Sequence, residues 1–138
     1  MALALLAAGC AGQEVEAPEG VETVTIRVGD ETLRVWVADT PDERSRGLQG
    51  VDGLPDGIDG MLFAWPEPGE RVFHMEDTLI PLDIWWFDAG LRLVGSDTMT
   101  PCTAVPCPLY PSPGEVLRAL ETPAGERDLP VGAALSAG

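Results

Sequence analysis

The sequence predicts a mainly β protein, a sandwich or barrel with one or two short helices over an opening. Apolar and polar residues alternate over several short runs, which is the pattern of half-buried strands. Turn-forming residues separate these runs: the chain of 138 residues has 16 glycines and 13 prolines. About seven to nine short strands with turns between them are typical of all-β sandwiches and barrels. The length suits one domain with its own core.

The folded part is expected to begin with a hairpin. Apolar residues alternate within 21–28, at 24, 26 and 28, and within 32–38, at 33, 35 and 37, which predicts two half-buried strands. The sequence Gly29-Asp30-Glu31 between them is typical of a turn.

A short helix is expected next. Asp39 or Thr40 can cap its N-terminus, and Pro41 suits the first helical position. Gly47 should end it. The glycine- and proline-rich residues 51–60 then predict a loop.

Residues 73–88 are the densest aromatic and aliphatic run of the chain. Alternation from 73 to 78 predicts one strand, and the nearly continuous apolar run 82–87 predicts a strand buried on both faces. Pro81 should mark the start of that strand or a bend before it. Further strands are expected at 61–65, 91–94, 115–121 and 133–135, with a brief helical turn at 122–129.

Asp83 is the one charged residue in the apolar run 82–87. A buried carboxylate needs a partner, because an unpaired buried charge costs on the order of several kcal/mol. We expect Arg46, just before the end of the predicted helix, to form an ion pair with Asp83.

The chain is strongly acidic. Its net charge is -15, and all 8 basic residues are arginines. This argues against nucleic-acid binding, which needs a positive surface, and against docking on anionic lipid through a basic patch. The chain has a single histidine, and neither a His-Glu-x-x-His pattern nor a glycine-rich phosphate loop is present. We therefore expect no metal site and no cofactor.

Residues 1–10 are expected to be a lipoprotein signal segment. Ala7-Ala8-Gly9-Cys10 is similar to a bacterial lipobox, in which the cysteine is lipidated and becomes the new N-terminus. Residues 11–20 are polar and contain Glu, Pro and Gly, as a tether would. The predicted location is outside the cytoplasm, lipid-anchored on the outer side of the cytoplasmic membrane or in the periplasm. The lipid anchor is the only membrane contact expected.

Cys102 and Cys107 lie in a proline-rich loop. An exported location permits disulfides, so we predict a structural bond between them. A redox dithiol is the alternative, but such sites usually have the spacing Cys-x-x-Cys.

Residues from about 24 to 135 carry an ordered set of short motifs. With them the chain resembles the DUF192 family, also called UPF0127. The resemblance implies a jelly-roll-like β fold, often behind an export signal, and a single domain over residues 21–138. It implies no activity. The motifs are Ala38-Asp39-Thr40-Pro41, Arg46-Gly47-Leu48, Gly60-Met61-Leu62-Phe63, the run from Phe73 to Ile84, Pro101-Cys102, Cys107-Pro108-Leu109-Tyr110, Leu120-Glu121 and Pro123-Ala124-Gly125.

The central motif departs from the family pattern at three positions. His74 stands where the family usually has tryptophan, Glu76 where it has a basic residue, and Asp77 where it has asparagine.

We favour a non-enzymatic accessory or binding module, monomeric, with an unidentified polysaccharide or protein ligand. Exposed aromatic side chains would form its binding face. No nucleophile, base and orienting group can be recognised together in the sequence, so no residue is assigned as catalytic. The aromatic residues considered are Trp65, Trp85, Trp86 and Tyr110. The candidate ligand-binding residues are Arg46, His74, Glu76, Thr78 and Asp83.

A hydrolase or other enzyme is the alternative. Its pocket would be built around His74, Glu76, Asp77 and Asp83. It requires a concave pocket that holds at least two of these side chains with shifted pKa values.

Overall fold

The computed structural model describes residues 17–138, so the predicted signal segment, Cys10 and residues 11–16 of the tether lie outside the described part. Within this part the fold is mainly β, as predicted, with one seven-stranded sheet and one short helix. No helix between residues 17 and 138 combines the length and the apolar character needed to cross a membrane. The elements are β1 (Glu22–Val28), β2 (Glu31–Ala38), α1 (Pro41–Arg46), β3 (Gly60–His74), β4 (Leu82–Phe87), β5 (Leu93–Met99), β6 (Leu109–Pro123) and β7 (Leu135–Ala137).

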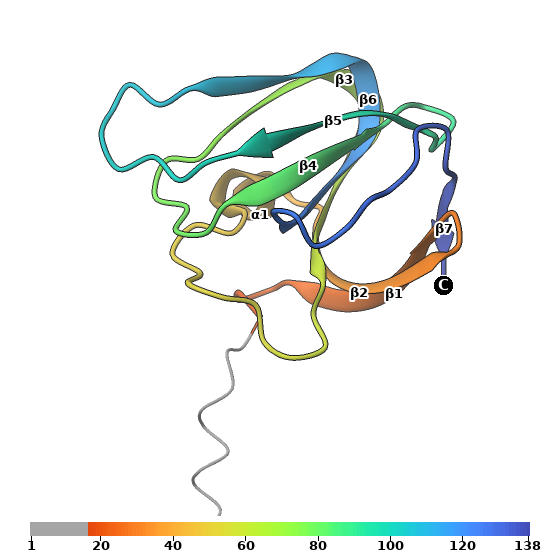
Figure 1. Cartoon of the computed structure of the whole chain (residues 1–138), viewed down its shortest axis with the longest axis horizontal. Coiled ribbons are helices and arrows are strands. Elements are labelled where there is room, and N and C mark those ends of the chain that lie inside the picture. The colour runs from red at the N-terminus through yellow and green to blue at the C-terminus, as the bar shows by residue number, and fades with distance from the viewer. Residues whose placement is uncertain (1–16) are drawn as a thin grey trace, which may run out of the picture.

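The strands follow the order β5-β4-β6-β3-β2-β1-β7 in a strongly curved sheet (Figure 1). Only β2 and β3 are parallel, and α1 with the following loop makes the crossover between them, as a parallel pair requires. The two edges of the sheet meet at one end. There Arg92 and Ala134 form an isolated bridge, and the Leu93 N–H donates to the Ala133 carbonyl over 2.9 Å. The architecture is therefore sandwich-like, with edges that touch without closing a barrel.

The long strand β3 corrects the prediction of two separate strands at 61–65 and 73–78. It runs without a break from Gly60 to His74, and its register with β6 shifts between Ala64 and Gly69. The prolines in this segment suggested a connection, but they lie in the irregular part, where a missing N–H breaks no ladder bond. Beyond His74 the chain turns, and the Thr78 N–H donates to the Met75 carbonyl over 3.1 Å.

Other predicted boundaries also change. The hairpin strand expected at 91–94 is β5, which spans Leu93–Met99. The strand expected at 115–121 is β6, which begins six residues earlier, at Leu109. No helix follows β6: the Glu126 N–H donates to the Pro123 carbonyl in a single turn. The last strand lies two residues later than expected at each end.

Strand β4 is buried on both faces, as predicted. Its alternate side chains enter two separate cores, so each face of the sheet has its own apolar layer. Leu82, Ile84 and Trp86 join the core that also contains Leu48, just after α1. Trp85 and Phe87 join the second core.

Helix α1 begins with the predicted cap. The Thr40 hydroxyl accepts from the Glu43 N–H over 3.2 Å, and the Glu43 carboxylate accepts from the N–H groups of Asp39 and Thr40. This is a capping box, which satisfies N–H groups left free at a helix start. The same bonds, chiefly the one from Asp39, lower the pKa of Glu43 below its usual value. The cap and Gly47, at φ 50° after the last turn, define the two ends of α1.

Candidate functional site

A pocket of about 470 Å³ lies between α1 and β3. We call it the arginine-rimmed pocket. Its volume is within the range of about 300–1,000 Å³ that is usual for small-ligand sites. Its lining residues are Pro41, Arg44, Ser45, Arg46, Gly47, Leu48, Gln49, Phe63, Trp65, Glu70, Arg71, Val72, Phe73, His74, Thr78 and Glu121.

Two arginines of the pocket are held in place by their surroundings. Arg71 lies over the ring of Trp65, with its guanidinium carbon 4.5 Å from the ring centroid, and it donates to the Glu67 carbonyl. Arg44 lies 5.9 Å from the same ring and donates to the Ala64 carbonyl over 2.9 Å. Burial, and then the charge of Arg44, lower the pKa of Arg71 below its usual value. The guanidinium remains charged at neutral pH, because no protein environment deprotonates arginine there.

The third arginine is less constrained. Arg46 is exposed, and it donates to the Glu19 carbonyl over 3.1 Å. With Arg44 and Arg71 it brings three of the 8 basic residues of an acidic chain to one pocket. The site is therefore a positive region on a molecule of net charge -15.

Glu121 lies on β6, and its side chain reaches the pocket from the core. Its Cα is paired with those of Met61 and Ile84 on the neighbouring strands, and only 4% of the residue is exposed. Burial raises the pKa of Glu121 to about 8, so the carboxyl group is mostly protonated at neutral pH. A protonated carboxyl group both donates and accepts hydrogen bonds.

Two buried side-chain atoms in the described part of the chain lack a hydrogen-bond partner, Arg71 Nε and Glu121 Oε1. Both belong to residues of the arginine-rimmed pocket. Buried polar groups are nearly always paired, because an unpaired one costs about 1–3 kcal/mol. Among residues 17–138, the buried side-chain atoms without a hydrogen-bond partner thus belong to one site.

Three of the five predicted ligand-binding residues line this pocket: Arg46, His74 and Thr78. Thr78 is buried, and His74 is exposed at the end of β3. Glu76 is also exposed but is not part of the lining. Its N–H donates to Nδ1 of His74 over 3.2 Å.

Asp83 is buried as predicted, but its predicted ion pair with Arg46 is wrong. Asp83 Oδ1 accepts from the Thr98 hydroxyl over 2.6 Å, and Oδ2 accepts from the Gly125 N–H over 2.9 Å. It does not line the arginine-rimmed pocket. A hydroxyl on the neighbouring strand and one backbone N–H thus replace the arginine, and neither can be identified from local sequence.

The four residues of the alternative enzyme site do not converge. Of His74, Glu76, Asp77 and Asp83, only His74 lines the arginine-rimmed pocket. Within residues 17–138, no three His, Cys, Asp or Glu side chains are grouped so as to hold a metal ion.

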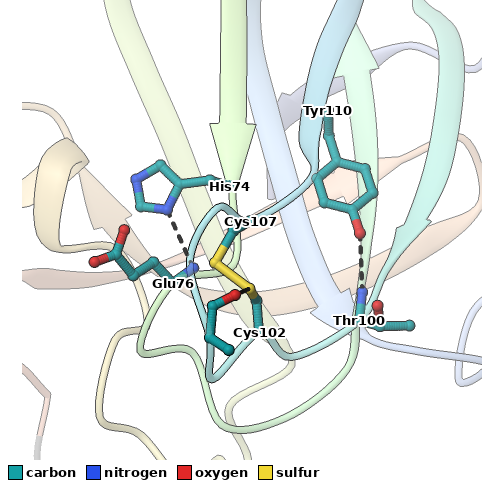
Figure 2. The surroundings of a disulfide bond; sticks show 7 residues. His74, Glu76, Thr100, Cys102, Cys107 and Tyr110 are labelled. Atoms are coloured by element: carbon teal, nitrogen blue, oxygen red, sulfur yellow. Dashed lines mark hydrogen bonds between the residues drawn. A yellow bond between two sulfur atoms is a disulfide. The ribbon is translucent and has the colours of Figure 1, made fainter.

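The predicted disulfide between Cys102 and Cys107 is present (Figure 2). Its loop lies against the turn after β3: the Cys102 N–H donates to the Met75 carbonyl, and Cys102 forms a bridge with Glu76. Because Thr78 of this turn and the neighbouring His74 at the end of β3 both line the pocket, the loop supports one wall of the site.

The proposed aromatic binding face is not formed as expected. Trp85 and Trp86 are buried in the two cores. Trp65 and Tyr110 are partly buried, and only Trp65 lines the pocket.

The prediction missed Arg44, Arg71 and Glu121 as site residues. A signal for Glu121 exists in the sequence, since it follows the apolar residues Ala119 and Leu120 in the strand predicted at 115–121. That is the same pattern that drew attention to Asp83. Arg71 carries no comparable signal, because its place depends on how β3 packs beside α1.

The fold and the site define a small β protein with a polar, arginine-rimmed pocket. The chain belongs to the DUF192 family, which is described as "Uncharacterized ACR". The sequence profile of this family matches residues 23–135. This confirms the resemblance. No curated protein is significantly similar to the chain.

Two crystal structures share the fold. One is a protein of Sinorhizobium meliloti 1021 provisionally described as a transcription regulator, with a TM-score of 0.77 and 21% identity, covering 88% of this chain and 98% of that one. The other is a protein of unknown function from Novosphingobium aromaticivorans DSM 12444, with a TM-score of 0.73 and 24% identity, covering 88% and 89%.

Proposed function

We propose that this protein is an exported, lipid-anchored, non-enzymatic module that binds a small polar ligand in the arginine-rimmed pocket. One observation carries the proposal. The two buried side-chain atoms without a hydrogen-bond partner among the described residues, Arg71 Nε and Glu121 Oε1, both belong to residues that line this pocket. A bound ligand, directly or through water, would supply the missing partners.

The geometry favours binding because the polar groups are already oriented. Trp65 and the Glu67 carbonyl hold Arg71, and the Ala64 carbonyl holds Arg44. A preorganised site loses less side-chain entropy when its ligand arrives.

A binding role fits the pocket better than catalysis. Among the described lining residues, neither the Ser45 nor the Thr78 hydroxyl is hydrogen-bonded to His74, whose Nδ1 instead accepts from the Glu76 N–H. A nucleophile would need such a base within reach.

The sequence supports the anchored location. Residues 7–10 are similar to a lipobox, residues 11–20 have the composition of a tether, and a disulfide suits an oxidising compartment. The regulator description of the Sinorhizobium protein does not fit this chain, because a net charge of -15 repels nucleic acid.

A thermal-shift panel tests the binding proposal. The full-length chain, Arg71→Met and the matched control Arg27→Met would be heated with neutral sugars, sugar acids, amino acids, hydroxy acids and inorganic phosphate. Arg27 is an exposed residue of β1 outside the pocket. At about 100 times its Kd, a ligand stabilises by about 2.7 kcal/mol, so we expect at least one compound to raise Tm by several degrees for the wild type and Arg27→Met, and less for Arg71→Met. Equal shifts in all three proteins, or none, would refute the proposal.

A further inference from the structure

We propose that the ligand is a sugar acid, a single ring whose carboxylate binds Arg71 and Arg44 while a ring hydroxyl reaches Glu121. This inference rests on the proposed function and names its ligand class. Three features of the pocket carry it: the charge of the rim, the state of the buried acid and the apolar walls.

The rim selects a single negative charge. Three arginines and only one exposed acid, Glu70, line the pocket, so an anion is attracted locally. The whole chain carries -15, so a polyanion is repelled at longer range. A protonated amine would be repelled by the positive charges of the three arginines.

The arginine geometry favours a carboxylate. The buried Nε–H of Arg71 has no hydrogen-bond partner, and the guanidinium carbon lies 4.5 Å from the centroid of the Trp65 ring. The planar fork of an arginine matches the two oxygens of a carboxylate. A neutral sugar would leave these donors poorly satisfied.

The buried acid favours a hydroxyl. Burial keeps Glu121 mostly protonated at neutral pH, so its carboxyl group can accept from a hydroxyl and donate to one. Thr78 is a second buried hydroxyl-bearing residue of the lining. A simple carboxylate such as acetate has no group to reach either of them.

The walls suit the apolar face of a sugar ring. Phe63 and Phe73 both line the pocket, with their ring centroids 4.8 Å apart in an edge-to-face pair. Aromatic rings pack against C–H groups while polar groups at the edges set the orientation. One ring with a carboxylate and several hydroxyls meets all three requirements.

Calorimetry on the full-length chain at pH 6.5 tests the ligand class with glucuronate, glucose, glucuronamide, acetate and inorganic phosphate. We expect glucuronate to bind at least about tenfold more tightly than each of the others, because each lacks the carboxylate, the ring or the ring hydroxyls. Arg71→Met should bring glucuronate and glucose to within about twofold of each other, while Arg27→Met keeps the difference. Glu121→Leu should weaken glucuronate about tenfold, and Glu121→Gln, which keeps an uncharged donor and acceptor, should stay within about threefold of the wild type.

The possible failures are distinguishable. Acetate or phosphate that binds as tightly as glucuronate, with the same loss in Arg71→Met, would overturn the sugar-acid assignment and leave small-ligand binding at the pocket standing. Tight binding of glucose or glucuronamide would overturn the role of the carboxylate. If none of these compounds binds and the broader panel also gives no shift, the sugar-acid assignment and the proposed function both fall. The ligand ratios of the wild type alone decide the ligand class, so a variant that fails to fold does not block the test.

Discussion

The guanidinium of Arg71 lies 4.5 Å above the ring of Trp65, and this contact sets the direction of the arginine at the edge of the pocket. A cation held over an aromatic ring contributes about 0.5–2 kcal/mol, depending on how far it is removed from water. Trp65 is itself packed edge-to-face against Phe73, with centroids 6.2 Å apart. Residues of the same strand thus fix both the wall and the charge of the site.

Replacing Trp65 with leucine should loosen Arg71. The Nε–H of Arg71 is buried, so its proton should exchange slowly with water in the wild type and faster in Trp65→Leu. Arginine side-chain NMR measures this exchange directly. Trp65→Phe, which keeps an aromatic face, serves as the matched control and should exchange at an intermediate rate. Equal exchange in all three proteins would mean that the stacking does not position the arginine.

Glu121→Gln should remove a pH-dependent loss of stability. Burial raises the pKa of Glu121 from its ordinary value of 4.5 to about 8 in the folded chain, so the folded state holds the proton more tightly. The stability contributed by protonated Glu121 is complete below pH 4.5, falls as the pH rises, and is lost above about pH 8. Between these two pH values, the free energy of unfolding falls by about 1.4 kcal/mol for each pH unit.

Urea unfolding at pH 5 and at pH 8 measures this difference. We expect Glu121→Gln to differ little from the wild type at pH 5 and to be more stable by a few kcal/mol at pH 8, on the order that a buried carboxylate costs. Because only the difference between the two proteins is compared, other titrating groups cancel. The same stability difference at both pH values would show that Glu121 is not a raised-pKa group.

Asp83 should be stabilised by Thr98 and not by Arg46. Asp83→Ala leaves the Gly125 N–H without its acceptor and should cost about 2–3 kcal/mol. Thr98→Val should cost about 1 kcal/mol, and the double mutant should lose less than the sum, because the two residues share one hydrogen bond. Arg46→Met, at an exposed site, should change the free energy of unfolding by less than about 0.5 kcal/mol. A large loss in Arg46→Met, with additive losses at 83 and 98, would restore the ion pair and contradict the structure.

Removing the disulfide should destabilise the domain modestly. Cys102 and Cys107 are separated by 5 positions in the chain, and closing so short a loop stabilises by about 2 kcal/mol in the chain-entropy treatment. The free energy of unfolding of the double variant Cys102→Ser, Cys107→Ser, measured by urea unfolding, should therefore be lower by about 2 kcal/mol. Mass spectrometry of the non-reduced wild type checks the bond itself, since two free thiols would show that it does not form.

Cys10→Ala should release the protein from the membrane. If Cys10 is lipidated, as residues 7–10 predict, the wild type should be found in the membrane fraction and the variant in the soluble exported fraction. Cys10→Ala with an unchanged membrane fraction would contradict the lipid anchor.

The elements that local sequence determines were predicted correctly. The hairpin of β1 and β2, the N-cap expected at Asp39 or Thr40 and found at Thr40, and the fully buried strand β4 each follow from alternation, capping chemistry or an apolar run within a few residues. These signals need no knowledge of distant parts of the chain.

The features that were missed depend on distant contacts. The prolines of β3 suggested a break because only the pairing with β6 shows that they lie in an irregular stretch. The charge of Asp83 predicts a partner but does not identify it. Its partners are Thr98, on the neighbouring strand β5, and Gly125, in the loop after β6. Arg71 and Glu121 are 50 positions apart on different strands, so their pocket forms only once β3, β6 and α1 are packed.

Ligand binding at the arginine-rimmed pocket is tested most directly by an amide NMR titration of the full-length chain. The titrant is the panel compound that raises Tm most. We predict that the shifted amide signals cluster at the end of α1, at residues 44–49, and on β3, at residues 71–74, and that Arg71→Met reduces these shifts. Shifts that cluster on another face, or that persist unchanged in Arg71→Met, would show that the pocket is not the binding site.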